Sequence, residues 1–452
     1  MVRTKRISSA ELVGAHLKQI EKVNPALNAV VEVLAVSALE AARKADEKLA
    51  SGTALGSLHG VPFSVKDSID VGGTKSTAGT LGRRNAEGAA RDATLVRRLR
   101  DAGAIPIAKT NLPDLLFSFE TDNLIFGRTN NPYDLARTSG GSSGGESALI
   151  AACGSPLGLG SDAFGSVRLP AAFSGIAGIK PTSGRLPRTG HVPPAGGWIE
   201  AVWQIGPMAR WTEDLVLAMG LLAGPDGEDF TCPPAPLMEA PAVRDMRVAF
   251  FSDNGIAPAT YPVREAVERA SAVLAAAGAN VEEQRPPGVE NAYELEFAIV
   301  GADGAEAIDA YYRDVGSNER YWLAENFVER LRGQRCGAAE LSSRWAAWDT
   351  YRAELQRFFT RFDAIVCPAY PELALTHGSS AAEGKFKGFS YTMAWNMAGA
   401  PAATVRCAEH AGLPVNVQIV AAPWHDLTAL EICRAIEDEL GGWKPAEGFP
   451  AI

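Results

Sequence analysis

The chain lacks the features that mark membrane, secreted and nucleic-acid-binding proteins. None of its apolar runs approaches the eighteen or so residues that span a bilayer. Its N-terminal segment has no apolar core of a secretion signal, so we expect a cytoplasmic protein with no stable membrane insertion. The net charge of −10 argues against nucleic acid as a partner, because phosphate binding needs a basic face.

Patterns for metal, disulfide and nucleotide binding are also missing. The six cysteines are scattered without a CxxC pair, which indicates reduced thiols. The six histidines show no zinc-ligand spacing, and we expect His59 and His191 to pack or hydrogen-bond rather than bind an ion. Residues 72–76 resemble a phosphate loop only partly, because the required glycines are absent. We therefore expect no metal and no cofactor.

What the chain does contain is an alternation of helical and strand patterns, which predicts an α/β fold. Ser8 and Glu11 have capping-box spacing, and they predict a helix that runs through Ile20. Further helices are expected over about 30–49, 92–102, 263–277, 290–360 and 427–440, and strands near 58–67, 104–109, 246–251 and 363–367. No linker is evident, so the sequence predicts a single domain over 1–452.

Two segments rich in serine and glycine carry the chemical signal, residues 139–145 and 160–170. Serines flanked by glycines suit tight turns that expose a hydroxyl together with backbone N–H groups, which could form an oxyanion hole. None of the histidines has a recognisable triad context. Lys66 lies in an apolar strand pattern, where burial would lower its pKa and leave a neutral amine able to act as a base. Taken alone, Lys66 also fits a surface lysine, and the glycines a structural turn.

The spacing of these segments resembles the amidase-signature family of serine hydrolases. Lys66 lies in Gly60-Val-Pro-Phe-Ser-Val-Lys66-Asp67, and Ser166 follows Ser142 by 24 residues and precedes Val167-Arg-Leu-Pro170. The segments 109–113, 123–132 and 412–418 match as well. The resemblance covers about residues 8–440, and residues 109–210 are most similar to fatty acid amide hydrolase-like members.

This resemblance implies a fold and a mechanism. The expected fold is a large twisted mixed β-sheet covered on both faces by α-helices. The catalytic core would occupy about 55–215, and the aromatic-rich helices of about 290–360 would shape a substrate funnel. Ser166 would attack the amide carbonyl, and Ser142, preceded by a cis peptide at Gly141, would relay the proton to Lys66. An acyl-enzyme would then be hydrolysed by water.

The resemblance also implies the residues around the nucleophile. The oxyanion hole would use the N–H groups of Ala163, Phe164, Gly165 and Ser166, and Leu116, Phe117 and Ser118 would line the substrate pocket. Asp162 and Arg168 are expected to hold the catalytic loop through structural hydrogen bonds, with Ser143 supporting Ser142. Trp395 and Asn396 would help to shape the funnel.

One position departs from the family pattern. Most members have two glycines before the nucleophile, whereas this chain has Phe164 followed by Gly165. The N–H group of a phenylalanine can still serve the oxyanion hole, although a positive φ at this position would strain it. We expect an intact hole and an acyl pocket that the Phe164 ring narrows or reshapes.

The predicted function is hydrolysis of a linear carboxylic amide of a small molecule, with release of a carboxylate and an amine or ammonia. Two alternatives stay open. The chain could be an A-type glutaminase subunit of a tRNA-dependent amidotransferase, which would work with a partner subunit. It could also be a catalytically silent scaffold on this fold, for which Phe164 is the only supporting feature. A homodimer is possible for an enzyme of this size.

Overall fold

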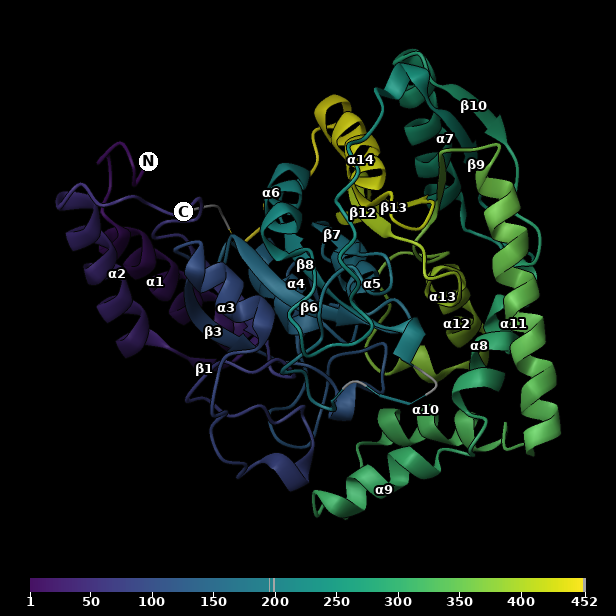
Figure 1. Cartoon of the computed structure of the whole chain (residues 1–452), viewed down its shortest axis with the longest axis horizontal. Helices are drawn as coiled ribbons and strands as arrows, with labels where there is room; N and C mark the ends of the chain where they lie inside the picture. Colours follow the sequence, from purple (N-terminus) through teal and green to yellow (C-terminus); the bar gives the residue numbers. More distant parts are fainter. Residues whose placement is uncertain (195, 198–199, 450–452) are drawn as a thin grey trace.

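The computed structural model describes residues 1–194, 196–197 and 200–449, in which strands and helices alternate along the chain (Figure 1). The strands are β1 (Val30–Val33), β2 (Pro62–Lys66), β3 (Ile105–Thr110), β4 (Asn130–Asn131), β5 (Asp134–Thr138), β6 (Leu157–Asp162), β7 (Ala177–Lys180), β8 (Gln204–Ala209), β9 (Arg247–Phe250), β10 (Asn280–Glu283), β11 (Ala364–Pro368), β12 (Ala402–His410) and β13 (Leu413–Ala421).

The helices of the N-terminal half are α1 (Ser9–Leu27), α2 (Ala35–Ala50), α3 (Thr94–Asp101), α4 (Gly144–Ala151), α5 (Arg168–Phe173) and α6 (Thr212–Leu222). Those of the C-terminal half are α7 (Tyr261–Ala276), α8 (Ala292–Val300), α9 (Glu306–Asp314), α10 (Trp322–Arg332), α11 (Ala338–Phe359), α12 (Glu383–Phe386), α13 (Ser390–Met397) and α14 (Asp426–Leu440).

Eleven strands form one mixed sheet in the order β1-β3-β2-β6-β8-β7-β12-β13-β11-β9-β10. Strands β3, β2 and β6 are parallel, whereas β8 runs antiparallel to both of its neighbours, β6 and β7. The sheet thus joins strands from the two halves of the chain, and the expected twisted mixed α/β architecture is confirmed.

Helices cover both faces of the sheet (Figure 1). On one face, α3, α6, α7 and α14 bury an apolar cluster with side chains from most of the central strands. Helices α1, α4, α5, α8 and α13 pack against the other face and its edge, in clusters that include many aromatic rings. The long helix α11 lies at one end of the molecule, on the right of Figure 1, beside α8.

Side-chain alternation along β2 assigns its residues to different surroundings. Phe63 and Val65 point into the large apolar cluster, whereas Ser64 and Lys66 point the other way, toward α4 and its preceding turn. Lys66 is the last residue of β2, and its side chain is fully buried at the carboxyl end of this interior parallel strand. Functional groups commonly gather at this end of α/β sheets.

The N-terminal region differs in part from the sequence expectation. The capping box of Ser8 and Glu11 is present at the start of α1, as predicted. The helix predicted over about 30–49 is wrong at its start, because Val30–Val33 pairs with β3 as the edge strand β1. Three of the four residues of β1 are valines, which favour strands, and Val30 is buried where it pairs with Thr110. This tertiary pairing prevails over the helical pattern that continues into α2. The helices expected over 290–360 are confirmed as α8–α11.

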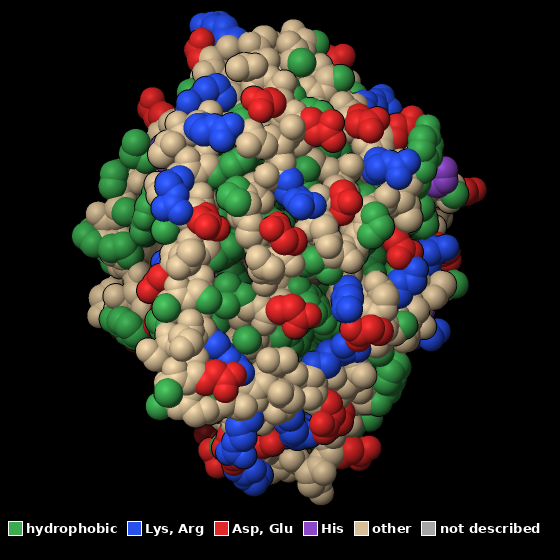
Figure 2. All heavy atoms as spheres, turned by 90° about the vertical axis from the view of Figure 1, so that its right-hand side faces the viewer, with side chains coloured by type: hydrophobic (Ala, Val, Ile, Leu, Met, Phe, Trp, Pro, Cys, Tyr) green, Lys and Arg blue, Asp and Glu red, His purple; other side chains and the backbone are tan. Residues whose placement is uncertain are grey.

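Figure 2 shows that acidic and basic side chains are interspersed over the face that carries α9–α11. The ion pair of Arg332 with Asp309 links α10 to α9, whereas its pair with Glu325 lies within α10. Within the described ranges, no helix is both long and apolar enough to cross a membrane. The six cysteines form no disulfide in the part of the chain that the structure describes. The same residues contain no cluster of three His, Cys, Asp or Glu side chains suited to a metal ion.

Candidate active site

Lys66 is the centre of a buried polar cluster. Its Nζ lies 2.6 Å from Ser142 Oγ, 3.0 Å from Ser143 Oγ and 3.1 Å from Ser161 Oγ. Burial lowers the pKa of the lysine well below its usual value, and the carboxylates of Asp162 and Glu146 oppose this shift only in part. A neutral amine surrounded by hydroxyl groups is a competent proton acceptor.

Ser142 and Ser143 occupy the turn before α4, which brings them over the end of β2. The peptide bond between Gly141 and Ser142 is cis, as the family resemblance implied. Ser143 Oγ bonds to the backbone of Ser161, at 3.3 Å from both its carbonyl oxygen and its nitrogen. The neighbouring strand β6 has a glycine at position 160, where a Cβ atom would lie only 2.8 Å from Ser143 Oγ. Close approach of the turn to β6 therefore explains the glycine at this position.

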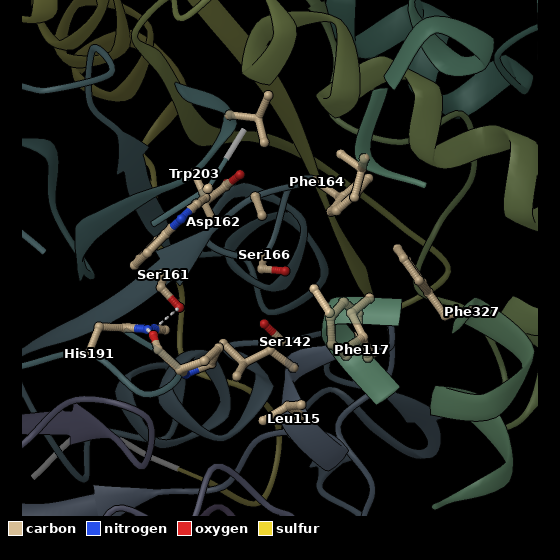
Figure 3. A pocket seen from close by; sticks show the side chains of 18 of the residues that line it. Leu115, Phe117, Ser142, Ser161, Asp162, Phe164, Ser166, His191, Trp203 and Phe327 are labelled. Carbon is tan, nitrogen blue, oxygen red and sulfur yellow. Dashed lines mark hydrogen bonds between the residues drawn. The ribbon is translucent and has the colours of Figure 1, made fainter. Parts of the chain in front are cut away.

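Ser166 lies in the turn between β6 and α5. Its backbone oxygen accepts a hydrogen bond from Ser143 N at 3.1 Å, which ties the two serine turns together. Gly165 has φ of 119°, and a Cβ atom there would lie 2.3 Å from Thr392 Oγ1. Glycine is thus required directly before the serine. Ser142 and Ser166 line the same cavity (Figure 3), although no direct hydrogen bond joins their side chains.

A buried ion pair holds this turn in place. Arg168 bonds to both carboxylate oxygens of Asp162, at 2.9 Å each, and both side chains are inaccessible to solvent. Burial alone would raise the pKa of Asp162, but the Arg168 guanidinium and its hydrogen bonds hold that pKa below the usual value. Arg168 also donates to Thr392 O at 2.9 Å and to Gln418 Oε1 at 2.8 Å. The structural role expected for Asp162 and Arg168 is confirmed.

The backbone amides beside Ser166 fall into two groups. Gly165 N donates to Asp162 Oδ1 at 2.8 Å, so its hydrogen points toward the buried carboxylate. The amides of Ala163, Phe164 and Ser166 have no acceptor among the described residues. Four donors were expected from the family resemblance, and the structure leaves three of them unengaged. Free amides near a serine hydroxyl are able to receive a developing oxyanion.

A cavity of about 200 Å³ opens above the serines (Figure 3). Its walls include Leu116, Phe117 and Ser118, which were expected there from the sequence. The expected funnel region contributes further wall residues, namely Val300, Asp303, Ala307, Ile308 and Phe327. The cavity is therefore polar where the serines lie and mostly apolar elsewhere.

Phe164 belongs to the apolar wall. Its ring packs edge-on against Phe327, with centroids 5.2 Å apart, and tilted against Phe297 at 6.0 Å. Phe164 is not among the residues with positive φ, so the backbone strain that a bulky residue could have caused does not arise. Its carbonyl oxygen accepts a hydrogen bond from Thr392 Oγ1 at 2.7 Å. The family's missing glycine is thus replaced by a side chain that fills space at the cavity.

Two expected funnel residues lie elsewhere. Trp395 is fully buried and does not line the cavity, so its expected role is wrong. Asn396 is also absent from the cavity wall, because its side chain bonds to Asp162, Arg168 and the carbonyl oxygen of Val202. Both residues lie on α13, which packs behind the turn that carries Ser166. Asn396 therefore supports the turn rather than the cavity wall.

Sequence reasoning missed a contact on the opposite side of Lys66. His191 lines the cavity, and its Nε2 lies 3.1 Å from Ser161 Oγ, as the dashed line in Figure 3 shows. The interpretation of His191 as a hydrogen-bonding histidine is confirmed, but its connection to Lys66 through Ser161 had no signal in the sequence. Ser161 and His191 are thirty positions apart in the sequence and lie in segments without a shared motif.

Comparison with known proteins agrees with this geometry. The family model described as Amidase matches residues 11–430. The A subunit of glutamyl-tRNA(Gln) amidotransferase from Symbiobacterium thermophilum is 35% identical over 480 residues, which cover 99% of this chain and 96% of that protein. The same subunit from other bacteria matches in a similar way. Indoleacetamide hydrolase of Bradyrhizobium diazoefficiens is 33% identical over 459 residues, covering 97% of this chain and 85% of that protein.

Solved structures include both kinds of relative. Fatty acid amide hydrolase superposes with a TM-score of 0.87 at 26% identity, covering 97% of this chain and 84% of that one. The A subunit of glutamyl-tRNA(Gln) amidotransferase from Thermotoga maritima has a TM-score of 0.79 at 27% identity, covering 95% of this chain and 91% of that one. With a family match over nearly its whole length and relatives above 30% identity, the chain belongs to the amidase-signature family.

Proposed function

We propose that the protein hydrolyses a linear carboxylic amide through Ser166, Ser142 and Lys66. The observation that carries this proposal is the buried amine of Lys66, which lies 2.6 Å from Ser142 Oγ, and Ser142 lines the same cavity as Ser166. Such an amine would need no metal or cofactor to activate a hydroxyl group. Proton transfer to a positioned base of this kind contributes about 10²- to 10⁴-fold to rate.

The proposed reaction begins with proton transfer from Ser142 Oγ to Lys66, while Ser142 takes the proton of Ser166. Ser166 Oγ then bonds to the amide carbonyl carbon, and the carbonyl oxygen becomes an oxyanion. The unengaged amides of Ala163, Phe164 and Ser166 would receive this charge. Each such donor is typically worth about 3–4 kcal/mol. Gly165 would contribute by its conformation, since its N–H is bonded to Asp162.

Collapse of the tetrahedral intermediate breaks the carbon–nitrogen bond. The proton held by Lys66 returns through Ser142 to the leaving nitrogen, which departs as an amine or ammonia. Water then attacks the acyl-enzyme by the same route and releases the carboxylate and free Ser166. Division into two steps lowers each barrier, which is the general advantage of covalent catalysis.

The apolar cavity favours an amide with an aryl or alkyl group. Leu116, Phe117 and Phe327 line it, and none of its described wall residues is an arginine or lysine. The α-carboxylate of free glutamine would need a cationic or N–H partner in such a site. The cavity therefore supports a free-standing hydrolase of small apolar amides.

The second candidate is a glutaminase of the A type, working within an amidotransferase. The sequence comparisons favour it, because A subunits match this chain at up to 35% identity and over more of their own length than the indoleacetamide hydrolase does. Such a protein would release ammonia from glutamine and act with a partner protein. Glutaminase activity and co-purification with a second polypeptide would support this candidate, whereas turnover of simple aryl amides by the isolated chain would support the hydrolase.

The deciding experiment for the shared chemistry uses a fluorophosphonate probe, which reacts with activated serines whatever the substrate. Labelling mapped by mass spectrometry to Ser166, lost in Ser166→Ala and slowed in Lys66→Ala, is the expected result. A folded protein that shows no labelling and no amide turnover would instead support a catalytically silent scaffold. A panel of aryl amides, alkyl amides and glutamine then separates the two substrate classes.

A further inference from the structure

His191 has a fixed proton position. Its Nδ1 lies 3.0 Å from the carbonyl oxygen of Pro193. A carbonyl oxygen can only accept, so the proton of the neutral ring is on Nδ1 and Nε2 presents a lone pair. The ring is buried, and burial lowers the pKa of His191 to about 3, which keeps the imidazole neutral at physiological pH.

The lone pair on Nε2 faces two hydroxyl groups. Ser161 Oγ and Ser68 Oγ each lie 3.1 Å from it. Each can act only as a donor to this nitrogen, because the nitrogen carries no hydrogen, and the two hydroxyl groups share its single lone pair. When Ser161 gives its proton to His191, the lone pairs of Ser161 Oγ are left for Lys66 Nζ, which lies 3.1 Å away.

The hydroxyl group of Ser143 has the same orientation toward Lys66 as that of Ser161, with its proton directed away from the amine. Its hydroxyl proton has an acceptor in the Ser161 carbonyl oxygen at 3.3 Å, and its oxygen lies 3.0 Å from Lys66 Nζ. Ser143 and Ser161 are therefore both placed to accept hydrogen bonds from Lys66. A neutral amine has two N–H groups and one lone pair. The two hydroxyl oxygens are nearer acceptors for the N–H groups than the Ser161 carbonyl oxygen, which lies 3.4 Å from Nζ.

We infer that His191 is a positioning residue, which accepts the Ser161 proton and thereby leaves the lone pair of Lys66 for the Ser142 hydroxyl. Ser142 Oγ lies 2.6 Å from Nζ, and the lone pair is the part of the amine that remains for its hydroxyl proton. Without His191, the Ser161 hydroxyl can turn its proton to Lys66 and compete with Ser142 for the lone pair. The inference rests on the proposed function of Lys66 as the base.

The surroundings of His191 hold the ring in the orientation that this role needs. Its ring packs against Trp203, with centroids 4.6 Å apart, and the Arg188 guanidinium lies 4.8 Å from the Trp203 ring centroid. Val192 N donates to Ser68 O at 2.7 Å, which fastens the segment after His191 to the segment after β2. The histidine is thus anchored to the same strand end that carries Lys66.

The test compares rates of Ser166 labelling by a fluorophosphonate in four proteins: wild type, His191→Phe, Ser161→Ala and the double variant. We expect His191→Phe to slow labelling about tenfold, the scale of one misdirected hydrogen bond. In the Ser161→Ala background, the same substitution should cause no further slowing, because His191 acts through the Ser161 hydroxyl. His191→Gln, whose amide oxygen can accept the Ser161 proton, should recover most of the wild-type rate.

Equal slowing by His191→Phe in both backgrounds would overturn the inference and make His191 only a cavity wall. A wild-type rate in His191→Phe would overturn it as well. His377→Phe, at a half-buried histidine outside the cavity, is the matched control and should label at the wild-type rate. Melting curves accompany each variant, and His191→Asn, too short to reach Ser161, replaces His191→Phe in the cycle if the latter unfolds. Failure of wild-type Ser166 to label would instead refute the proposed function.

Discussion

The two sides of the cavity are built on different physical principles. Around Lys66, directional hydrogen bonds join the amine to the hydroxyl groups of Ser142, Ser143 and Ser161, and these residues come from strand ends and tight turns. Opposite them, Phe164 and Phe327 pack as rings in contact, without directional bonds. Hydrogen bonds on the polar side depend strongly on the positions of their atoms, whereas ring packing on the aromatic side can accommodate side chains of different shape. Under the proposed function, the first side would carry out the chemistry and the second would select the substrate.

Removal of the nucleophile tests the polar side with the largest expected effect. We expect Ser166→Ala to reduce turnover by on the order of 10⁴- to 10⁶-fold, because no acyl-enzyme can form. Turnover of an aryl amide and probe labelling measure it. Ser118→Ala, at another serine of the cavity wall, should retain most of the activity. Comparable loss in both variants would mean that the cavity, and not an activated Ser166, determines turnover.

Replacement of Lys66, the proposed base, is expected to have the second-largest effect. Lys66→Ala should lower kcat by about 10²- to 10⁴-fold. Because burial lowers the pKa of Lys66, the wild-type rate should rise with pH while the amine loses its proton, and then reach a plateau. The pH dependence of kcat/KM checks this. An optimum near pH 5, together with full activity of Lys66→Ala, would show that another group is the base.

A buried carboxyl beneath the site gives a smaller effect, on stability. Burial raises the pKa of Glu146 to about 7, against the hydrogen bonds from Ser64 and Thr110. The folded protein therefore binds more protons than the unfolded chain between about pH 4.5 and 7, and stability contributed by this group decreases as pH rises through that interval. Between about pH 4.5 and 7, the free energy of unfolding of the wild type should therefore fall by up to about 3 kcal/mol relative to that of Glu146→Gln.

Thermal unfolding of both proteins across this pH interval measures the difference. We expect the difference between the two free energies of unfolding to change with pH, so that Glu146→Gln gains stability relative to the wild type as the pH rises toward 7. A constant gap would mean that Glu146 has a similar pKa in the folded and unfolded chains. Burial also raises the pKa of Glu437 to about 7, but this group has no interaction with Glu146, so its contribution cancels in the comparison.

The aromatic side should respond least. Phe164→Gly removes a ring from the cavity wall, and we expect it to broaden acceptance toward bulkier acyl groups, with changes in relative kcat/KM of about tenfold. Fluorophosphonates or amides of increasing acyl size provide the measurement. Phe362→Leu, at a buried ring that stacks on Phe358 and does not line the cavity, is a control for altered packing. An unchanged substrate profile in Phe164→Gly would disprove a role for this ring in selection.

The sequence predicted the polar side better than the aromatic side. Ser142, Ser166 and Lys66 lie in motifs whose glycines and spacing reflect close backbone approach, so their local sequence carries the geometry. The segment 290–360 was predicted as helical and aromatic, but single wall residues such as Phe327 depend on how helices pack across the sheet. Periodicity shows that a residue faces the interior, and it does not show which neighbours it meets there.

Two further cases show where sequence reasoning ends. Val30–Val33 reads as part of a helix until its partner β3 is known, because strand pairing is a long-range property. His191 belongs to no motif, and its contact with Ser161 arises only when β6 and the loop before Pro193 meet at the end of the sheet. Trp395 illustrates the reverse error, since an aromatic residue suggests a cavity wall and is here part of the core.

The bonds of Arg168 have a consequence for biosynthesis. Three of its partners, Thr392, Asn396 and Gln418, lie more than 220 residues after it in the chain. While the ribosome still holds the C-terminal part, this guanidinium and the carboxylate of Asp162 lack those partners, and the nucleophile turn lacks its backing from α13 and β13. The turn that carries Ser166 therefore reaches its final set of contacts only after the chain has been synthesised as far as Gln418.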